Sequence, residues 1–204
     1  MKKDENSTKD HILEVARSEF ASRGYYATSM DSIVRLTGLS KGAIYWHFRS
    51  KFDLFHAVLD QQLDNVREIL FPRKEDLRDK DLKQFFLERG ESLIDFHLSR
   101  RENVLLWLHI TLEAQRGNTE VAELAKEILD SVITELIDTI TEVGPPFNEM
   151  EDLDLRELIL LFEAILNGLL LDLHFKREPG LSKKFWKYLV KRLIPEVENN
   201  VAKT

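Results

Sequence analysis

The run SKGAIYWHF, from Ser40 to Phe48, combines residue types that suit contact with a DNA duplex. At about 100° per residue on a helix, Ile44 and Phe48 share one face, which we expect to be buried. Small residues would let the helix backbone approach a groove, and cationic or polar-tipped side chains would reach phosphates and bases. The residues left for such contact are Lys41, Gly42, Ala43, Tyr45, Trp46 and His47. The alternative interpretation is an aromatic structural turn with a solvated face.

The start of this short helix offers a second kind of contact. Ser40 is a suitable helix cap, and no acidic residue follows it three positions later. We therefore expect the first-turn amides to stay available for a phosphate at the positive end of the helix dipole. Lys41 and Lys51 add cations at two neighbouring helix starts.

A preceding short helix is predicted to position this run. Thr28 with Asp31 three residues later gives a capping-box pattern, and Gly38 suits the left-handed end of a helix. Two helices joined by a tight turn containing glycine form a helix-turn-helix, whose second helix enters the major groove of DNA.

Two longer helices should flank the helix-turn-helix. Ser7 with Asp10 predicts the start of a bracing helix that ends at Gly24, and residues 1–6 before it are expected to form a mobile arm. A linking helix is predicted over residues 51–71, with its end set by Pro72.

The runs TSMDSIVRLTG and LSKGAIYWHFRSK closely resemble the DNA-binding domain of TetR-family (tetracycline repressor-like) transcriptional regulators, over about residues 8 to 60. The resemblance implies a homodimeric, ligand-released repressor with about nine helices. It also implies DNA contacts, mostly to the sugar-phosphate backbone, at the positions that match the family: Ser29, Ser40, Lys41, Gly42, Tyr45, His47 and Lys51. Thr28, Ala43 and Trp46 complete the predicted DNA-binding set.

Two details qualify this resemblance. GAIYWHF, with Trp46, is most similar to the branch of the family that controls multidrug efflux. Val34 and Thr37 stand where the family often has alanine, which changes the packing slightly and leaves the predicted fold as it is.

The charge of the chain is unevenly distributed. The 204 residues carry a net charge of -7, yet residues 1–51 hold nine Lys and Arg against six Asp and Glu. The first 51 residues are therefore at +3 and the rest at -10. This asymmetry favours a DNA-binding head on an acidic body. The absence of cysteine excludes disulfides and fits a reducing cytoplasm, and MKKDENSTKD has no apolar core typical of a signal peptide.

The rest of the chain is predicted to be all-α. Helices are expected at about 79–98, 102–116, 119–143, 154–176 and 181–194, separated by glycine and proline, and no long stretch alternates as a strand does. We expect a DNA-binding domain over 1–50 and a ligand-binding and dimerisation domain over 72–204.

A strongly apolar segment, Leu158 to Phe175, predicts a homodimer interface. Glu163, Asn167 and Asp172 interrupt it, so it is not expected to span a membrane. With the last helix it could form an antiparallel four-helix contact with a second copy. The predicted interface residues are Leu158, Leu161, Ile165, Leu169, Phe185, Trp186, Leu189 and Leu193. Packing inside a single chain is the alternative.

Aromatic and polar side chains on the later helices are candidates for an effector pocket. Glu113 is the most notable, because a buried acid needs a partner that a cationic ligand could supply. The full candidate set is Phe86, Phe96, His97, Trp107, His109, Thr111, Glu113, Phe162 and Asn167. The alternative is that the rings are ordinary core and Glu113 is solvated.

No pattern typical of catalysis is present: the chain lacks GxSxG, HExxH and Walker motifs and has no Glu three residues before a His. We therefore predict no enzyme, no metal and no cofactor. The predicted function is a repressor that binds a palindromic operator and is released by a small molecule. The alternative is a helical ligand-binding sensor or adaptor that does not bind DNA.

Overall fold

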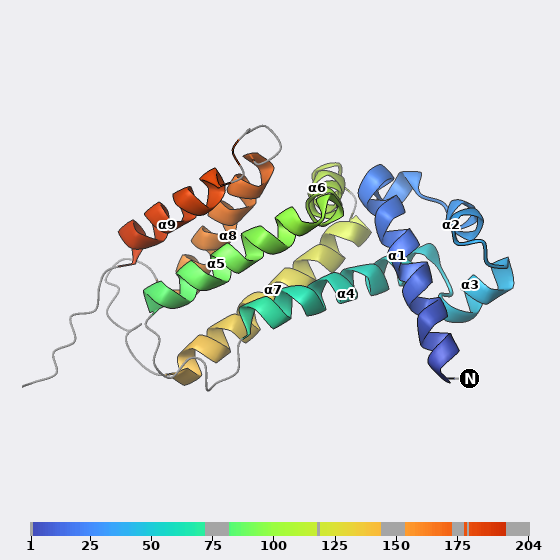
Figure 1. Ribbon diagram of the computed structural model, residues 1–204, viewed down its shortest axis with the longest axis horizontal. Helices are drawn as coiled ribbons and strands as arrows, with labels where there is room; N and C mark the ends of the chain where they lie inside the picture. The colour runs from blue at the N-terminus through green and yellow to red at the C-terminus, as the bar shows by residue number, and fades with distance from the viewer. Residues whose placement is uncertain are drawn as a thin grey trace, which may run out of the picture. The chain divides into compact units, whose positions relative to one another are not determined.

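The computed structural model describes residues 2–71, 82–117, 119–143, 154–172, 178 and 180–194, and all regular structure among them is helical (Figure 1). The helices are α1 Lys2–Ala27, α2 Met30–Thr37, α3 Lys41–His47, α4 Lys51–Leu70, α5 Leu82–Ser99, α6 Arg101–Gln115, α7 Thr119–Val143, α8 Leu155–Asp172 and α9 Leu181–Leu193. The predicted all-α fold is confirmed for these residues. Parts of two predicted helices, residues 79–81 and 173–176, lie outside the described residues.

The helices pack into two compact units. Unit 1 comprises Met1–Val66 and Leu98–Leu129, and unit 2 comprises Arg67–His97 and Asp130–Thr204. This division does not follow the predicted domain boundaries at residues 50 and 72, because α6 packs along α1 and so belongs to unit 1. The predicted functional division into a DNA-binding and an effector domain stays a prediction.

Helix α1 is longer than predicted. It begins at Lys2, so the backbone of residues 2–6 is helical and the predicted mobile arm there is wrong. Lysine and glutamate propagate a helix well, so this polar start needs no apolar stripe to remain helical. Gly24 interrupts the helix with φ 78° and ψ 170°, as predicted, and one short turn follows it.

The core of unit 1 fixes the helix-turn-helix to α1. Ile12, Ala16 and Phe20 lie one or two turns apart on α1 and are fully buried, together with Ile33 of α2 and Ile44 of α3. Figure 1 shows α2 and α3 on the same side of α1. The apolar face of each short helix is therefore held inward, and its opposite face is left open.

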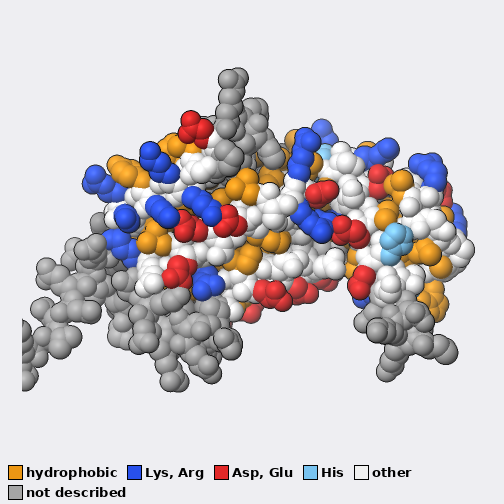
Figure 2. All heavy atoms as spheres, viewed as in Figure 1, with side chains coloured by type: hydrophobic (Ala, Val, Ile, Leu, Met, Phe, Trp, Pro, Cys, Tyr) orange, Lys and Arg blue, Asp and Glu red, His pale blue; other side chains and the backbone are white. Residues whose placement is uncertain are grey.

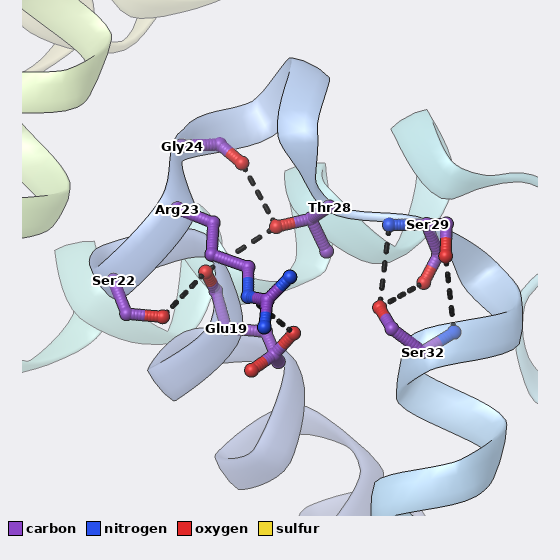
Figure 3. Close-up of polar contacts among 7 residues, drawn as sticks. All are labelled: Glu19, Ser22, Arg23, Gly24, Thr28, Ser29 and Ser32. Atoms are coloured by element: carbon purple, nitrogen blue, oxygen red, sulfur yellow. Dashed lines mark hydrogen bonds and ion pairs between the residues drawn. The ribbon is translucent and has the colours of Figure 1, made fainter.

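The junction between α1 and α2 differs from the sequence prediction (Figure 3). Ser29 is the N-cap of α2: its hydroxyl accepts from the Ser32 amide at 3.0 Å, and the Ser29 amide donates to the Ser32 hydroxyl at 3.3 Å. The predicted cap by Thr28 with Asp31 is therefore wrong by one residue. The Thr28 hydroxyl is buried and lies within hydrogen-bond distance of two carbonyl oxygens of α1, Gly24 at 2.8 Å and Glu19 at 3.3 Å.

The core of unit 2 is built on three rings. Phe162 of α8 stacks on Phe86 of α5 with centroids 4.4 Å apart, and it meets Trp186 of α9 edge-on at 5.1 Å. The indole Nε1 of Trp186 donates to the Phe86 carbonyl at 3.0 Å. Gly90 lies directly against the indole, where a side chain would overlap it. These contacts join α5, α8 and α9 into one core.

Ion pairs line the surface of α5 and α9 in unit 2. Lys183 pairs with Asp95 at 2.6 Å, and Lys187 pairs with Glu91 at 2.8 Å. Figure 2 shows basic side chains gathered over these helices with acidic side chains between them. Two lysines of α9 thus have acidic partners on α5, although α9 itself carries five Lys and Arg and no acidic residue.

Candidate nucleic-acid interface

Helix α3 presents the predicted outward face. Ile44 and Phe48 are buried, as the helical spacing predicted, while the side chain of Trp46 is 68% exposed and that of Tyr45 is 39% exposed. Lys41 and Gly42 are also exposed, and Ala43 and His47 are half-buried at the edges of the face. The structure thus brings two rings, two small residues and a cation to one open surface.

The N-terminus of α3 is only partly open to an anion. The Ser40 hydroxyl accepts from the Ala43 amide at 3.1 Å, so the prediction that all first-turn amides remain available is wrong for Ala43. No acidic residue lies in the first turn of α3. The helix dipole is therefore not neutralised from within the helix.

Lys41 is not an isolated cation. Its ammonium lies 2.9 Å from a carboxylate oxygen of Asp31 on α2 and 5.9 Å from the centroid of the Tyr45 ring. The hydrogen bond to Asp31 and its charge raise the pKa of Lys41, so the side chain stays cationic. Both Lys41 and Asp31 are largely exposed, and the pair sits beside the open face of α3.

Lys51 is placed differently from Lys41. It is half-buried, and its ammonium donates to the carbonyl oxygens of Tyr25 at 2.9 Å and Thr28 at 3.1 Å. Thr28 itself is buried. These two members of the predicted DNA-binding set face the protein interior, whereas Ser29 and Ser40 remain exposed at the helix starts.

A polar cluster that the sequence did not reveal links α1 to α6 within unit 1. The buried guanidinium of Arg17 donates to Glu14 at 2.8 Å and to Asn103 at 3.5 Å, and Arg100 donates to Glu14 at 3.1 Å. Burial raises the pKa of the Glu14 carboxyl, but the two guanidinium groups outweigh burial and lower it overall. The only signal in the sequence was an arginine on an otherwise apolar helix stripe. Glu14 lies three residues from Arg17, but the bonds to Asn103 and Arg100 each span 86 residues.

Residues 12–58 match the family described as bacterial regulatory proteins, tetR family. The helix-turn-helix segment of this chain belongs to the tetR family. The match covers α2, α3 and parts of α1 and α4, which are the elements that position the open face of α3.

Two TetR-family relatives extend this similarity. The HTH-type transcriptional regulator AcrR of Shigella flexneri is 38% identical over 68 residues, which cover 33% of this chain and 32% of AcrR. The HTH-type transcriptional regulator QacR of Staphylococcus aureus is 33% identical over 99 residues, covering 48% of this chain and 52% of QacR. The similarity thus spans about a third to a half of these relatives, both of which are regulators and not enzymes.

The fold of a TetR-family regulator extends over almost the whole chain. The crystal structure of a TetR family transcription regulator from Marinobacter aquaeolei superposes with a TM-score of 0.67, covering 92% of this chain and 97% of that one at 20% identity. Identity at this level supports the shared fold and says nothing of a shared effector.

The predicted effector residues do not converge on one pocket. Phe86 and Phe162 belong to the ring core of unit 2, and Trp107, His109, Thr111 and Glu113 belong to unit 1. The Thr111 hydroxyl is exposed and donates to the Trp107 carbonyl at 3.0 Å.

Two of the predicted polar effector residues already have partners in the protein. Glu113 is buried, but its carboxylate pairs with Arg116 one turn later at 3.2 Å, so the predicted need for a ligand cation is not supported. In unit 2, His97 Nδ1 donates to the Leu93 carbonyl at 2.8 Å, and burial lowers the pKa of this imidazole.

A small crevice in unit 1 does contain two of the candidates, His109 and Glu113. Its empty volume is about 170 Å³. The other lining residues are Phe20, Tyr25, Phe55, Leu106, Ile110 and Val121. That volume includes open solvent, and the crevice itself does not enclose even a water-sized sphere. Small-molecule pockets usually measure about 300 to 1,000 Å³, so this crevice is too small for a drug-sized effector.

A polar pair on α8 provides another effector candidate. Asn167 donates to the Glu163 carboxylate at 3.3 Å, and both side chains are half-buried. Burial raises the pKa of Glu163. The remaining candidate, Phe96, lies on α5 with its ring edge-on to His97 at 5.2 Å.

The predicted dimer residues divide by burial. Leu158 and Trp186 are 1% exposed within unit 2, so their inclusion in an interface between chains is wrong. Phe185 is exposed, and the half-buried members are Leu161, Ile165, Leu169, Leu189 and Leu193. Three large apolar side chains that the prediction omitted are exposed on the same two helices: Leu160, Leu171 and Tyr188.

Among the described residues, no helix is long and apolar enough to cross a membrane. In the same residues, no group of three or more His, Cys, Asp or Glu side chains could hold a metal ion.

Proposed function

We propose that this protein is a DNA-binding transcriptional regulator. In this proposal it represses by occupying a two-fold symmetric operator as a homodimer, and a small molecule releases it. The observation that carries the proposal is the open face of α3, where exposed Trp46 and Tyr45 lie beside Gly42 and Lys41. Aromatic side chains that gather on one exposed face beside polar residues typically mark an interaction site. Such a regulator would act in the cytoplasm, where its DNA is.

The proposed docking divides the face by chemistry. The N-terminal residues of a recognition helix meet base edges, so Ala43 and Trp46 would read sequence, with Tyr45 and His47 at the flanks. Lys41 and the exposed hydroxyls of Ser29 and Ser40 would meet phosphates. Phosphate contacts fix the register of a protein on the duplex and carry no sequence information directly.

An exposed apolar strip supports the proposed homodimer. Leu160 and Leu171 lie on the outward face of α8, with Ala164 and Gly168 between them, and Phe185 and Tyr188 are exposed on α9. Contiguous exposed apolar surface of this kind typically marks an interface. Two copies are also what a palindromic site requires, because a seven-residue recognition helix alone makes few base contacts.

The proposed release follows from linkage. An effector that binds the DNA-free arrangement more tightly than the DNA-bound one must weaken operator affinity by the same factor. Glu163 and Asn167 are the polar pair we propose for contact with this effector, because they lie half-buried on a largely apolar helix.

The decisive experiment selects duplexes from a random pool at low ionic strength and then measures affinity for the selected and a scrambled duplex. We expect a palindromic selected sequence, salt-dependent binding and a dimer by light scattering. Ala164→Glu, which puts a charge in the apolar strip, should give monomers with weakened operator binding, whereas Thr134→Glu, at an exposed position of α7, should not. A monomer that binds no duplex at low salt would refute the proposal and favour a sensor without a DNA role.

A further inference from the structure

Four protein groups lie beside the ammonium of the half-buried Lys51. It donates to two backbone carbonyls, those of Tyr25 and Thr28, at 2.9 and 3.1 Å. It also lies 4.3 Å from the centroid of the Tyr25 ring and 5.5 Å from that of the Tyr26 ring. An ammonium has three N–H donors, and here two are bound to carbonyls while aromatic faces lie beside it. Little donor capacity is left for a phosphate.

The electrostatic setting also favours an internal role. Burial lowers the pKa of Lys51, and the Glu120 carboxylate at the start of α7 opposes this by favouring the charged form. Burial and then Glu120 raise the pKa of Tyr25 to about 12, so its ring stays neutral beside the cation. Lys41, in contrast, is largely exposed and pairs with a carboxylate that is itself exposed.

The two carbonyls that Lys51 binds belong to the corner that sets the start of α2. Tyr25 lies just after the break at Gly24, and Thr28 immediately precedes the N-cap Ser29. The Thr28 hydroxyl also closes this corner, through its bond to the Gly24 carbonyl (Figure 3). Helix ends leave carbonyls without partners, and a cation there is favourable. Lys51 thus ties the start of α4 to the corner between α1 and α2.

We propose that Lys51 is a positioning residue, which holds the corner before α2 in the DNA-binding arrangement and does not itself contact phosphate. The proposal rests on the proposed DNA-binding function. It departs from what the resemblance to the TetR family implied for this position, and the departure comes from the two carbonyl bonds and the neighbouring rings.

The test compares Lys51→Met with Lys41→Met in duplex titrations over a range of salt concentrations, with wild type measured alongside. Each phosphate contact contributes about 0.9 to the slope of log affinity against log salt. Lys41→Met should therefore lower the slope by about one. Lys51→Met should leave the slope unchanged and weaken binding by about tenfold, as expected when about a tenth of the molecules keep the competent arrangement.

A second readout follows the corner itself. Amide exchange at Ser32 and Ile33, at the start of α2, should speed up more in Lys51→Met than in Lys41→Met. Lys51 binds the corner carbonyls, whereas Lys41 reaches α2 only through the exposed Asp31 carboxylate. Lys51→Arg keeps the charge, so a phosphate contact would tolerate it, whereas the space between two carbonyls and a ring would not accept the larger guanidinium. We expect Lys51→Arg to weaken binding with the slope intact.

The outcomes separate the possibilities. A slope that falls by about one in Lys51→Met, with Lys51→Arg binding like wild type, would show a phosphate contact and overturn the proposal. Unchanged affinity of the folded Lys51→Met protein would show a role in stability alone and also overturn it. Failure of wild type to bind any duplex would refute the proposed function, and this proposal with it, whereas the other two outcomes leave the proposed function standing.

Discussion

The indole of Trp46 on α3 is 68% exposed, whereas the indole of Trp186 on α9 is 1% exposed and donates to a backbone carbonyl. Each indole has a glycine nearby: Gly42 lies one turn before Trp46 on α3, and Gly90 of α5 lies against Trp186. A side chain at Gly90 would overlap the Trp186 ring, but a side chain at Gly42 would come only within 4.0 Å of the Ser40 hydroxyl. In unit 2 the protein itself fills the space over the glycine, and on α3 that space stays open.

This comparison separates packing from recognition. A buried ring with its polar atom bonded is explained by the core that it completes. An exposed ring beside an uncovered glycine is not explained by a core, and the proposed DNA contact accounts for it. Each of the following changes tests one side of the comparison.

The largest effect is expected from Gly90→Ala. The added methyl group would overlap the Trp186 indole, and overpacking of a tight core typically costs about 1 to 3 kcal/mol of the free energy of unfolding, occasionally more. Urea denaturation measures the change. Gly180→Ala is the matched control, because no atom lies within 4 Å of a Cβ added at Gly180. It should shift the free energy of unfolding by less than about 0.5 kcal/mol. Equal stabilities of the two variants would contradict the packing of Trp186.

Trp46→Ala should produce the next largest effect, in DNA binding. Losing a side chain that contacts base edges costs about 1 to 3 kcal/mol of binding free energy at the preferred sequence and relaxes the preference. Thermal stability should remain that of wild type, because the side chain is mostly exposed. Affinities for a panel of single-base operator variants measure this. If the affinity for every operator variant fell by the same factor, this would contradict a role for Trp46 in base recognition.

Gly42→Ala sharpens the comparison with Gly90. Alanine favours a helix over glycine by up to about 1 kcal/mol, so stability should hold or rise while operator affinity falls, because the methyl group projects into the open face. Melting temperature and duplex affinity are measured on the same preparation. A variant that is more stable and binds the operator as tightly as wild type would show that no duplex approaches α3 closely at this point.

Asp31→Asn should have the smallest effect. It removes the carboxylate that pairs with Lys41 and a negative charge beside the proposed phosphate contacts. Affinity for operator and scrambled duplex should both rise, roughly threefold, in line with Coulomb energies between exposed charges in water. Reduced affinity would mean that Asp31 holds Lys41 in its DNA-binding position.

The sequence predicted the helices and the inner face of α3 well, because periodic apolar residues and glycine breaks report local structure directly. It failed at the α2 cap, where two adjacent hydroxyl residues could both serve. Which one caps depends on the end of α1, because the Thr28 hydroxyl is bound to α1 carbonyls and only Ser29 is left.

Side chains with distant partners were beyond sequence reasoning. Lys51 donates to carbonyls 26 and 23 residues away in the sequence, so its position within the motif could not show where its ammonium lies. Phe86, Phe162 and Trp186 carry the residue types of a pocket or an interface, and only their mutual contacts show that they form a core. Periodicity identifies a buried face without identifying what covers it.

The division of unit 1 has a practical consequence for isolating the DNA-binding head. Leu106, Ile110 and Val121 belong to the same apolar cluster as Ile12 and Phe20 of α1. A fragment that ends at residue 71 would expose those α1 side chains to water and would be prone to aggregation. A DNA-binding unit that folds on its own would need residues 98–129 joined to the N-terminal segment by a flexible linker, because unit 1 is discontinuous in the sequence.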